Sequence, residues 1–208
     1  MCLTLDGPGV THAGQAAGLC AAGARWIQLR MKGAGRGAWL AEARATVAVC
    51  RPFGAVVIVN DDAAIAAESG ADGVHLGSRD GDWREARRLL GGRAIIGGTV
   101  NHAADAGRAA DAGCLDYVGI GPFRYTATKQ NLPPVLGLEG IRALLPLLGG
   151  LPAWAIGGIQ PADLAAIREA GLAGVAVSSG LGRAGRGAEN VGDYLARWES
   201  APQPVSHS

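Results

Sequence analysis

Several features that would point to a particular class of protein are missing from this sequence. It contains no run of 18 or more apolar residues, which excludes a hydrophobic segment of membrane-spanning length. The 19 basic and 18 acidic residues nearly cancel to a net charge of +1, so the charge gives no reason to expect nucleic acid or a membrane surface as partner. The first residues lack the basic start and long apolar core of a secretory signal, and we expect a cytoplasmic protein.

Cysteine is scarce and scattered. The four residues are Cys2, Cys20, Cys50 and Cys114, and no two of them form a CxxC pair. We interpret them as buried or incidental thiols in a reducing compartment, rather than as zinc ligands or disulfides. Glycine, in contrast, is abundant at 34 residues, and many glycines stand at the ends of apolar runs. That placement indicates tight turns and close approaches of the backbone.

One pattern repeats along the chain: a short apolar run, a loop, and then an alanine-rich stretch with helical spacing. The predicted strands are 2–5, 26–30, 55–59, 72–76, 94–97, 116–120, 153–157 and 173–177. The predicted helices are 12–22, 37–51, 62–69, 82–90, 102–112, 138–148, 161–170 and 189–198. Six of these helices are followed by a glycine-containing turn, the common way to end a helix.

Eight strand–helix units predict an α/β fold, a (β/α)8 TIM barrel. Short apolar strands without alternation are typical of a parallel sheet that is buried on both faces. A doubly wound open sheet is the alternative. We expect one domain over residues 1–199, followed by a disordered tail at 200–208. In a barrel, functional residues gather just after the strands.

A basic cluster follows the second predicted strand. Alternation along the strand places Gln28 and Arg30 on the same face, where burial without partners is costly. Arg30 and Lys32 together are suited to hold a polyanion. A basic pair on the surface is the alternative.

Acidic and amide side chains follow the third and fourth strands. Asn60 and Asp61 close the third strand, and Asp80 lies just past the fourth. These strand ends are neighbours in a barrel, and their oxygen atoms suit Mg²⁺. Helix capping is the alternative, because Asn and Asp are favoured N-caps and Asp80 could cap the helix that begins near Asp82. With the basic cluster nearby, we favour a site for a metal-bound diphosphate.

Hydroxyl groups and histidines follow the fifth strand. Thr99 comes after Gly97-Gly98 and either donates to a phosphate oxygen or caps the next helix. We interpret His102 as a solvated residue at a helix start, and His75 as a buried histidine with its hydrogen bonds satisfied.

Two more clusters follow strands six to eight. The loop after the sixth strand is long, and long loops in compact domains are usually functional or disordered. Its hydroxyls and its lysine make it a candidate anion-binding lid, formed by Thr126, Thr128 and Lys129. The loops after strands seven and eight form the usual phosphate site of such barrels. The residues available there are Gly157, Gly158, Ser178 and Ser179.

Taken together, these stretches resemble the thiamine phosphate synthase family. The resemblance extends from about residue 26 to 182 and keeps the family's order and spacing. It rests on QLRMK, VNDDAAIAAESGADGVHLGSRD, IIGGTVNH, DYVGIGPFRYTATK, GLEGI, AIGGI and GVAVSSGL. It implies a (β/α)8 barrel. It also implies an enzyme that joins hydroxymethylpyrimidine diphosphate to thiazole phosphate with release of pyrophosphate.

The resemblance also implies a role for each candidate residue. Contacts to the pyrimidine diphosphate would come from Gln28, Arg30, Lys32, Asn60, Thr99 and Lys129. Asp61 and Asp80 would hold Mg²⁺, and Lys129 and Arg30 would act on the leaving charge. Thr126 and Thr128 would face the thiazole, and Gly158, Ser178 and Ser179 would bind its phosphate. The oligomeric state is left open, a homo-oligomer included.

Two positions depart from the family pattern. Met31 stands where an acidic residue is usual, and Arg124-Tyr125 occur where a shorter loop with proline is common. Arg124 is either a ligand for a carboxylate on the thiazole or a solvent-exposed arginine.

Three rival functions remain as alternatives. A thiazole tautomerase would need neither the aspartate pair nor Lys129. A non-catalytic barrel that binds a phosphate ligand would be expected to have lost at least one of Arg30, Asp61, Asp80 and Lys129, and all four are present. An indole- or histidine-pathway barrel would rely on an acid/base pair, and no such pair stands out.

Overall fold

The computed structural model describes residues 1–7, 9–125, 134–181 and 187–202. Its strands form one parallel sheet in the order β1 to β8. The strands are β1 (Cys2–Leu3), β2 (Trp26–Leu29), β3 (Val56–Asn60), β4 (Gly73–Leu76), β5 (Ile95–Val100), β6 (Tyr117–Ile120), β7 (Ala153–Ile156) and β8 (Gly174–Ala176). The predicted barrel is confirmed, and the open doubly wound sheet is wrong.

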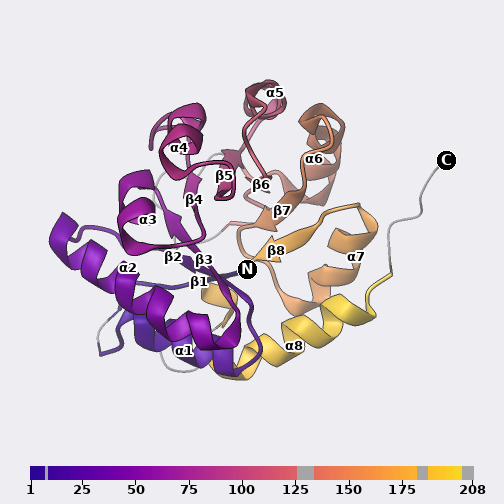
Figure 1. Cartoon of the computed structure of the whole chain (residues 1–208). Coiled ribbons are helices and arrows are strands. Elements are labelled where there is room, and N and C mark those ends of the chain that lie inside the picture. The colour runs from indigo at the N-terminus through magenta and orange to yellow at the C-terminus, as the bar shows by residue number, and fades with distance from the viewer. Residues whose placement is uncertain (8, 126–133, 182–186, 203–208) are drawn as a thin grey trace.

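Helices alternate with the strands and surround the sheet (Figure 1). They are α1 (His12–Ala21), α2 (Arg36–Cys50), α3 (Ala63–Ser69), α4 (Trp83–Leu90), α5 (Ala103–Ala112), α6 (Gly137–Leu144), α7 (Leu164–Glu169) and α8 (Gly187–Ser200). Short 3₁₀ turns are η1 (Arg51–Phe53), η2 (Leu145–Leu148), η3 (Pro161–Asp163) and η4 (Ser179–Leu181). Within the described residues, no helix is long and apolar enough to cross a membrane.

The last strand returns to the first and closes the barrel. Cys2 pairs with Val177 in a parallel bridge, and the Leu3 N–H donates to the Val177 carbonyl at 2.8 Å. Closure brings the carboxyl ends of all strands to one mouth. The loops after β2, β3 and β4 therefore face the loops after β7 and β8 across that mouth.

Alternation along each strand separates a helix-facing layer from the barrel interior. Ile27 and Leu29 of β2 are fully buried in the apolar core. The interior is closed toward the amino ends of the strands by an aromatic group of Trp26, Tyr117 and Trp154, with ring centroids 5.0 to 6.0 Å apart. The open end of the interior is therefore the mouth.

The fifth strand is longer than predicted. It continues from Ile95 through Gly97 and Gly98 to Val100. A Cβ on Gly97 would lie 2.3 Å from the Tyr117 ring, so the glycine leaves room for an aromatic ring inside the barrel. Thr99 consequently lies within the strand, and its prediction as a helix cap is wrong because His102 is the N-cap of α5.

Candidate active site

One cavity of about 240 Å³ opens at the mouth. It is lined by every predicted site residue that the structure describes: Gln28, Arg30, Lys32, Asn60, Asp61, Asp80, Thr99, Gly158, Ser178 and Ser179. These residues come from segments as far apart as β2 and β8. Thr126, Thr128 and Lys129, predicted for the lid, lie outside the described residues.

The two aspartates that line the cavity are not helix caps. Asp62 caps α3, accepting from the Ile65 N–H at 2.8 Å, and this leaves Asp61 free of that role. Asp61 has a left-handed backbone with φ of 73°, uncommon for a residue other than glycine. Its N–H donates to the carbonyl of His75 at 2.8 Å, which holds this conformation at the end of β3.

In the turn after β4, one aspartate likewise caps the next helix while another faces the cavity. Asp82 caps α4, accepting from the N–H groups of Arg84 and Glu85 at 2.9 Å each. Asp80 instead accepts from the Gly77 N–H at 2.9 Å, which folds the loop so that its carboxyl faces the cavity. The capping alternative for Asp61 and Asp80 is therefore wrong.

A compact charge cluster results on this side of the cavity. Lys32 makes an ion pair with Asp61, whose side chain is 18% exposed. Burial, followed by the hydrogen bond and charge of neighbouring Asp61, raises the pKa of Asp80 above its ordinary value of 3.8. Two carboxylates held this close favour a cation between or beside them.

Polar groups also line the barrel interior below this cluster. His75 Nδ1 lies 3.1 Å from the Tyr117 hydroxyl, and His75 Nε2 lies 3.0 Å from Thr99 Oγ1. Gln28 is 3% exposed, and its side chain lies near Tyr117, whose pKa is raised by burial. His75 is buried and hydrogen-bonded, as predicted. Tyr117, His75 and Thr99 are therefore linked in one hydrogen-bonded row inside the barrel.

Across the mouth, the loops after β7 and β8 approach the cavity with backbone and small side chains. Gly157 and Gly158 both have left-handed φ values, of 102° and 63°. A Cβ on Gly158 would lie 2.9 Å from the Cβ of Arg124, so the loop after β6 packs directly on it. Within the described part of the chain, the buried Ser178 Oγ has no hydrogen-bond partner. A buried hydroxyl without a hydrogen-bond partner calls for an explanation, and a polar ligand in the adjoining cavity would supply one.

Arg124 is a solvent-exposed arginine, as one of its two interpretations predicted, with 45% of its side chain accessible. Its guanidinium makes a two-pronged ion pair with Asp163, with both N–O distances 2.8 Å, and also donates to the Gly158 carbonyl at 2.8 Å. This pair lowers the pKa of Asp163. Arg124 therefore ties the loop after β6 to the loop after β7 and is not available as a ligand for a carboxylate.

Sequence reasoning missed several polar residues of the cavity lining. Arg79 and Asn101 line it, and so does His75, which was interpreted only as a core residue. Asn101 donates to the Gly121 carbonyl at 2.6 Å and thereby braces the start of the loop after β6. Arg79 had a visible signal, because a cation directly precedes Asp80 in GSRD.

Among the described residues, no group of three or more His, Cys, Asp or Glu side chains is placed to hold a metal ion. Asp61 and Asp80 form a pair only. Mg²⁺ usually binds to one or two carboxylates and completes its shell with water and substrate phosphates. The donor set therefore fits Mg²⁺ bound together with a phosphate ligand, and does not fit a cage made of protein alone.

Comparison with known proteins identifies the family to which this chain is similar. The family described as Thiamine monophosphate synthase matches residues 6–181. A protein named Thiamine-phosphate synthase from Phocaeicola vulgatus is 43% identical over 166 residues, covering 78% of this chain and 79% of that protein. One of the same name from Bacteroides thetaiotaomicron is 45% identical over 166 residues, with the same coverage of both chains.

A solved structure supports the same assignment. Thiamine phosphate pyrophosphorylase from Pyrococcus furiosus superposes with a TM-score of 0.83 at 26% identity, covering 95% of this chain and 94% of that one. The family match, the sequence relatives and this fold neighbour point the same way. The chain belongs to the thiamine monophosphate synthase family.

Proposed function

We propose that this protein is a thiamine phosphate synthase, a transferase of thiamine biosynthesis. It condenses hydroxymethylpyrimidine diphosphate with thiazole phosphate, giving thiamine phosphate and pyrophosphate. The bond from the pyrimidine CH₂ to the diphosphate oxygen breaks, and a bond from the thiazole nitrogen to that CH₂ forms. The observation that supports this best is a single cavity with a cation-and-carboxylate arc at β2 to β4 and a glycine-and-serine arc at β7 and β8.

The diphosphate is proposed to bind on the first arc. Arg30 and Lys32 supply positive charge, Asn60 an amide, and Thr99 a hydroxyl, all on the wall of the cavity. Asp61 and Asp80 are the proposed ligands of Mg²⁺, which would neutralise charge on the departing pyrophosphate. In the free protein, Lys32 is paired with Asp61, so this lysine neutralises the carboxylate until the diphosphate arrives.

The pyrimidine and the thiazole phosphate are proposed to occupy the interior and the second arc. Gln28, with Tyr117 and His75 behind it, would hold the edge of the aminopyrimidine. Gly158, Ser178 and Ser179 would hold the phosphate of the thiazole, supported by the orphaned Ser178 hydroxyl.

The remaining roles rest on the family resemblance alone. Thr126 and Thr128 would contact the thiazole. Lys129, with Arg30, would stabilise the charge on the leaving group. A cytoplasmic location is supported by four cysteines that are all free. A homo-oligomer stays a prediction, and light scattering on the purified protein would test it.

The test is an assay for thiamine phosphate from the two purified substrates, with and without Mg²⁺. We expect product only when both substrates and the metal are present. Calorimetric titration then separates a synthase from a tautomerase. Mg²⁺-pyrophosphate and thiazole phosphate should bind at the same time, because their arcs lie on opposite sides of the mouth. Strict competition between them, or full activity in EDTA, would contradict the proposal.

A further inference from the structure

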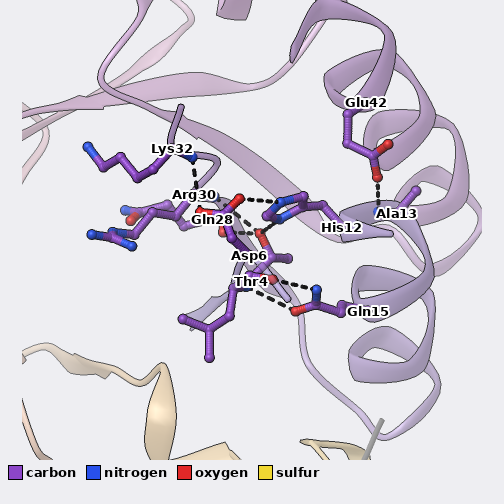
Figure 2. A network of polar contacts seen from close by, with 10 residues as sticks. Thr4, Asp6, His12, Ala13, Gln15, Gln28, Arg30, Lys32 and Glu42 are labelled. Carbon is purple, nitrogen blue, oxygen red and sulfur yellow. Dashed lines mark hydrogen bonds and ion pairs between the residues drawn. The ribbon is translucent and has the colours of Figure 1, made fainter. Parts of the chain in front are cut away.

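A cluster of polar side chains lies beside the active-site cavity without lining it. It consists of Thr4, Asp6 and His12, from the chain after β1 and the first residue of α1 (Figure 2). Thr4 is fully buried and His12 is 6% exposed. Buried polar groups are costly unless they are paired, so the contacts of this cluster show what it stabilises.

Two members of the cluster hold the backbone of the proposed diphosphate-binding residues. The strand pair β1–β2 ends with the Thr4 N–H donating to the Gln28 carbonyl at 3.0 Å. Beyond that point, side chains take over as acceptors. Thr4 Oγ1 accepts from the Arg30 N–H at 3.2 Å, and Asp6 Oδ2 accepts from the Lys32 N–H at 3.1 Å. Alternate residues of this segment are thereby fixed after the regular ladder has ended.

His12 joins the two acceptors to each other. Its Nδ1 lies 2.7 Å from Thr4 Oγ1, and its Nε2 lies 3.1 Å from Asp6 Oδ1. A carboxylate only accepts, so Nε2 carries a proton toward Asp6. Nδ1 then either accepts from the Thr4 hydroxyl or donates to it. In both cases, Thr4 Oγ1 and Asp6 Oδ2 keep lone pairs for the two backbone N–H groups.

Two helices anchor the cluster. The Gln15 side chain of α1 accepts from the Leu5 N–H at 3.0 Å and donates to the Leu5 carbonyl at 2.7 Å. Glu42 of α2 accepts from the Ala13 N–H at 2.7 Å, which holds the start of α1. Both backbone polar groups of Leu5, the residue between Thr4 and Asp6, are therefore held by α1.

We infer that Thr4, Asp6 and His12 form a positioning cluster that directs Arg30 and Lys32 into the diphosphate site. Figure 2 shows the side chains of Arg30 and Lys32 pointing away from α1, while their backbone faces Thr4 and Asp6. The cluster touches no substrate and acts through the backbone of the two cations. The inference rests on the proposed function, because it takes Arg30 and Lys32 to bind a diphosphate.

Asp6→Asn tests this inference. The cluster requires both carboxylate oxygens to accept, and an asparagine has one acceptor oxygen and one donor NH₂. If the NH₂ faces Lys32, that N–H loses its acceptor; if it faces His12, the ring must take the tautomer protonated at Nδ1, and the Lys32 N–H keeps a neutral amide acceptor in place of a carboxylate. We expect the Kd of Mg²⁺-pyrophosphate, measured by calorimetry, to rise about tenfold, the change that corresponds to one hydrogen bond to a charged group. The Kd of thiazole phosphate should change by less than about twofold, because its arc receives nothing from this cluster.

Asp116→Asn is the matched control. The Asp116 carboxylate also accepts a strand N–H, from Ile96 at 2.7 Å, and pairs with Arg87. Its side chain is 45% exposed, against 44% for Asp6, but it lies at the amino ends of the strands, away from the cavity. We expect the control to leave pyrophosphate affinity unchanged. Equal effects of the two variants on that affinity would overturn the inference.

A double-mutant cycle distinguishes positioning from a general structural role. In a Lys32→Ala background, Asp6→Asn should weaken pyrophosphate binding by no more than about twofold, because most of its effect passes through Lys32. A full additive loss would overturn the inference. Hydrogen exchange gives a readout that needs no ligand: the Lys32 amide should exchange faster in Asp6→Asn than in wild type, and unchanged exchange would also overturn it. If wild type neither binds pyrophosphate nor makes thiamine phosphate, the proposed function fails, while the exchange measurement still decides the role of Asp6.

Discussion

Replacing Asp80 with asparagine separates metal binding from loop structure. Asp80 accepts from the Gly77 N–H at 2.9 Å, and the amide oxygen of an asparagine can keep that hydrogen bond. The loop should therefore survive, while the negative charge is lost. A charge-assisted contact is worth about 3 kcal/mol at the upper end, so we expect kcat/KM to fall about 100-fold at saturating Mg²⁺.

Asp82→Asn is the control, two residues further along the chain. Asp82 is the cap of α4, and asparagine is as good an N-cap as aspartate. The control should retain activity and change the free energy of unfolding by only about 0.5 kcal/mol or less. Without metal, Asp80→Asn should be at least as stable as wild type, because it removes a like charge beside Asp61.

The assay is steady-state turnover over a range of Mg²⁺ concentrations, with urea unfolding of each metal-free protein. Asp80→Asn should need more Mg²⁺ for half-maximal rate, and Asp82→Asn should not. The reasoning would be refuted if Asp80→Asn were fully active, or if its loss of activity were matched by a loss of stability. Asp80 would then be a loop-forming residue and no metal ligand.

Two other predictions follow from packing and charge. Arg124→Gln should lower the free energy of unfolding by about 1 kcal/mol at pH 7, because the two-pronged pair with Asp163 is partly exposed. That pair lowers the pKa of Asp163, so its contribution is present above the ordinary value of 3.8 and is lost as the pH falls through the lowered value. Denaturant titrations at several pH values should show the difference in stability between Arg124→Gln and wild type shrinking as the pH falls below 3.8, and a difference that stays constant would contradict the prediction. Gly97→Ala should lower the free energy of unfolding by about 1–3 kcal/mol, because its Cβ would overlap the Tyr117 ring. Gly107→Ala in α5, where nothing lies within 4 Å, should raise it by about 0.5–1 kcal/mol. Thermal melts that rank the two variants the other way would contradict the packing argument.

The repeat of strands and helices could be predicted from sequence because each element carries its own signal. Apolar runs mark the strands, and glycine turns mark the helix ends, as at Gly70 and Gly113, which are left-handed C-caps of α3 and α5. In β5, by contrast, the local signal of the glycines was misleading. Gly97-Gly98 indicates a turn by local propensity, but the strand continues because Gly97 meets a ring from the neighbouring strand. That requirement is tertiary and has no local trace.

The gathering of the candidate residues around one cavity could be predicted from sequence, but not all of their contacts. Ten candidates share one cavity because strand ends meet at the mouth of a barrel. Arg124 could not be understood from its neighbours, since its partner Asp163 is 39 residues away. The cluster at Thr4, Asp6 and His12 was equally hidden, because its contacts are to backbone N–H groups of the segment that follows β2.

The ambiguity between a cap and a metal ligand has a physical origin at these turns. A strand that leads into a helix needs an acceptor for the first N–H groups of that helix, and aspartate serves well. An active site at the same strand end needs carboxylates as well. This chain resolves the conflict by placing two aspartates in each turn: Asp62 and Asp82 cap, while Asp61 and Asp80 face the cavity. Because each cap satisfies its own helix, the charge of the other aspartate is not drawn into capping and stays available to a cation. A single aspartate in either turn would have to serve one purpose at the expense of the other.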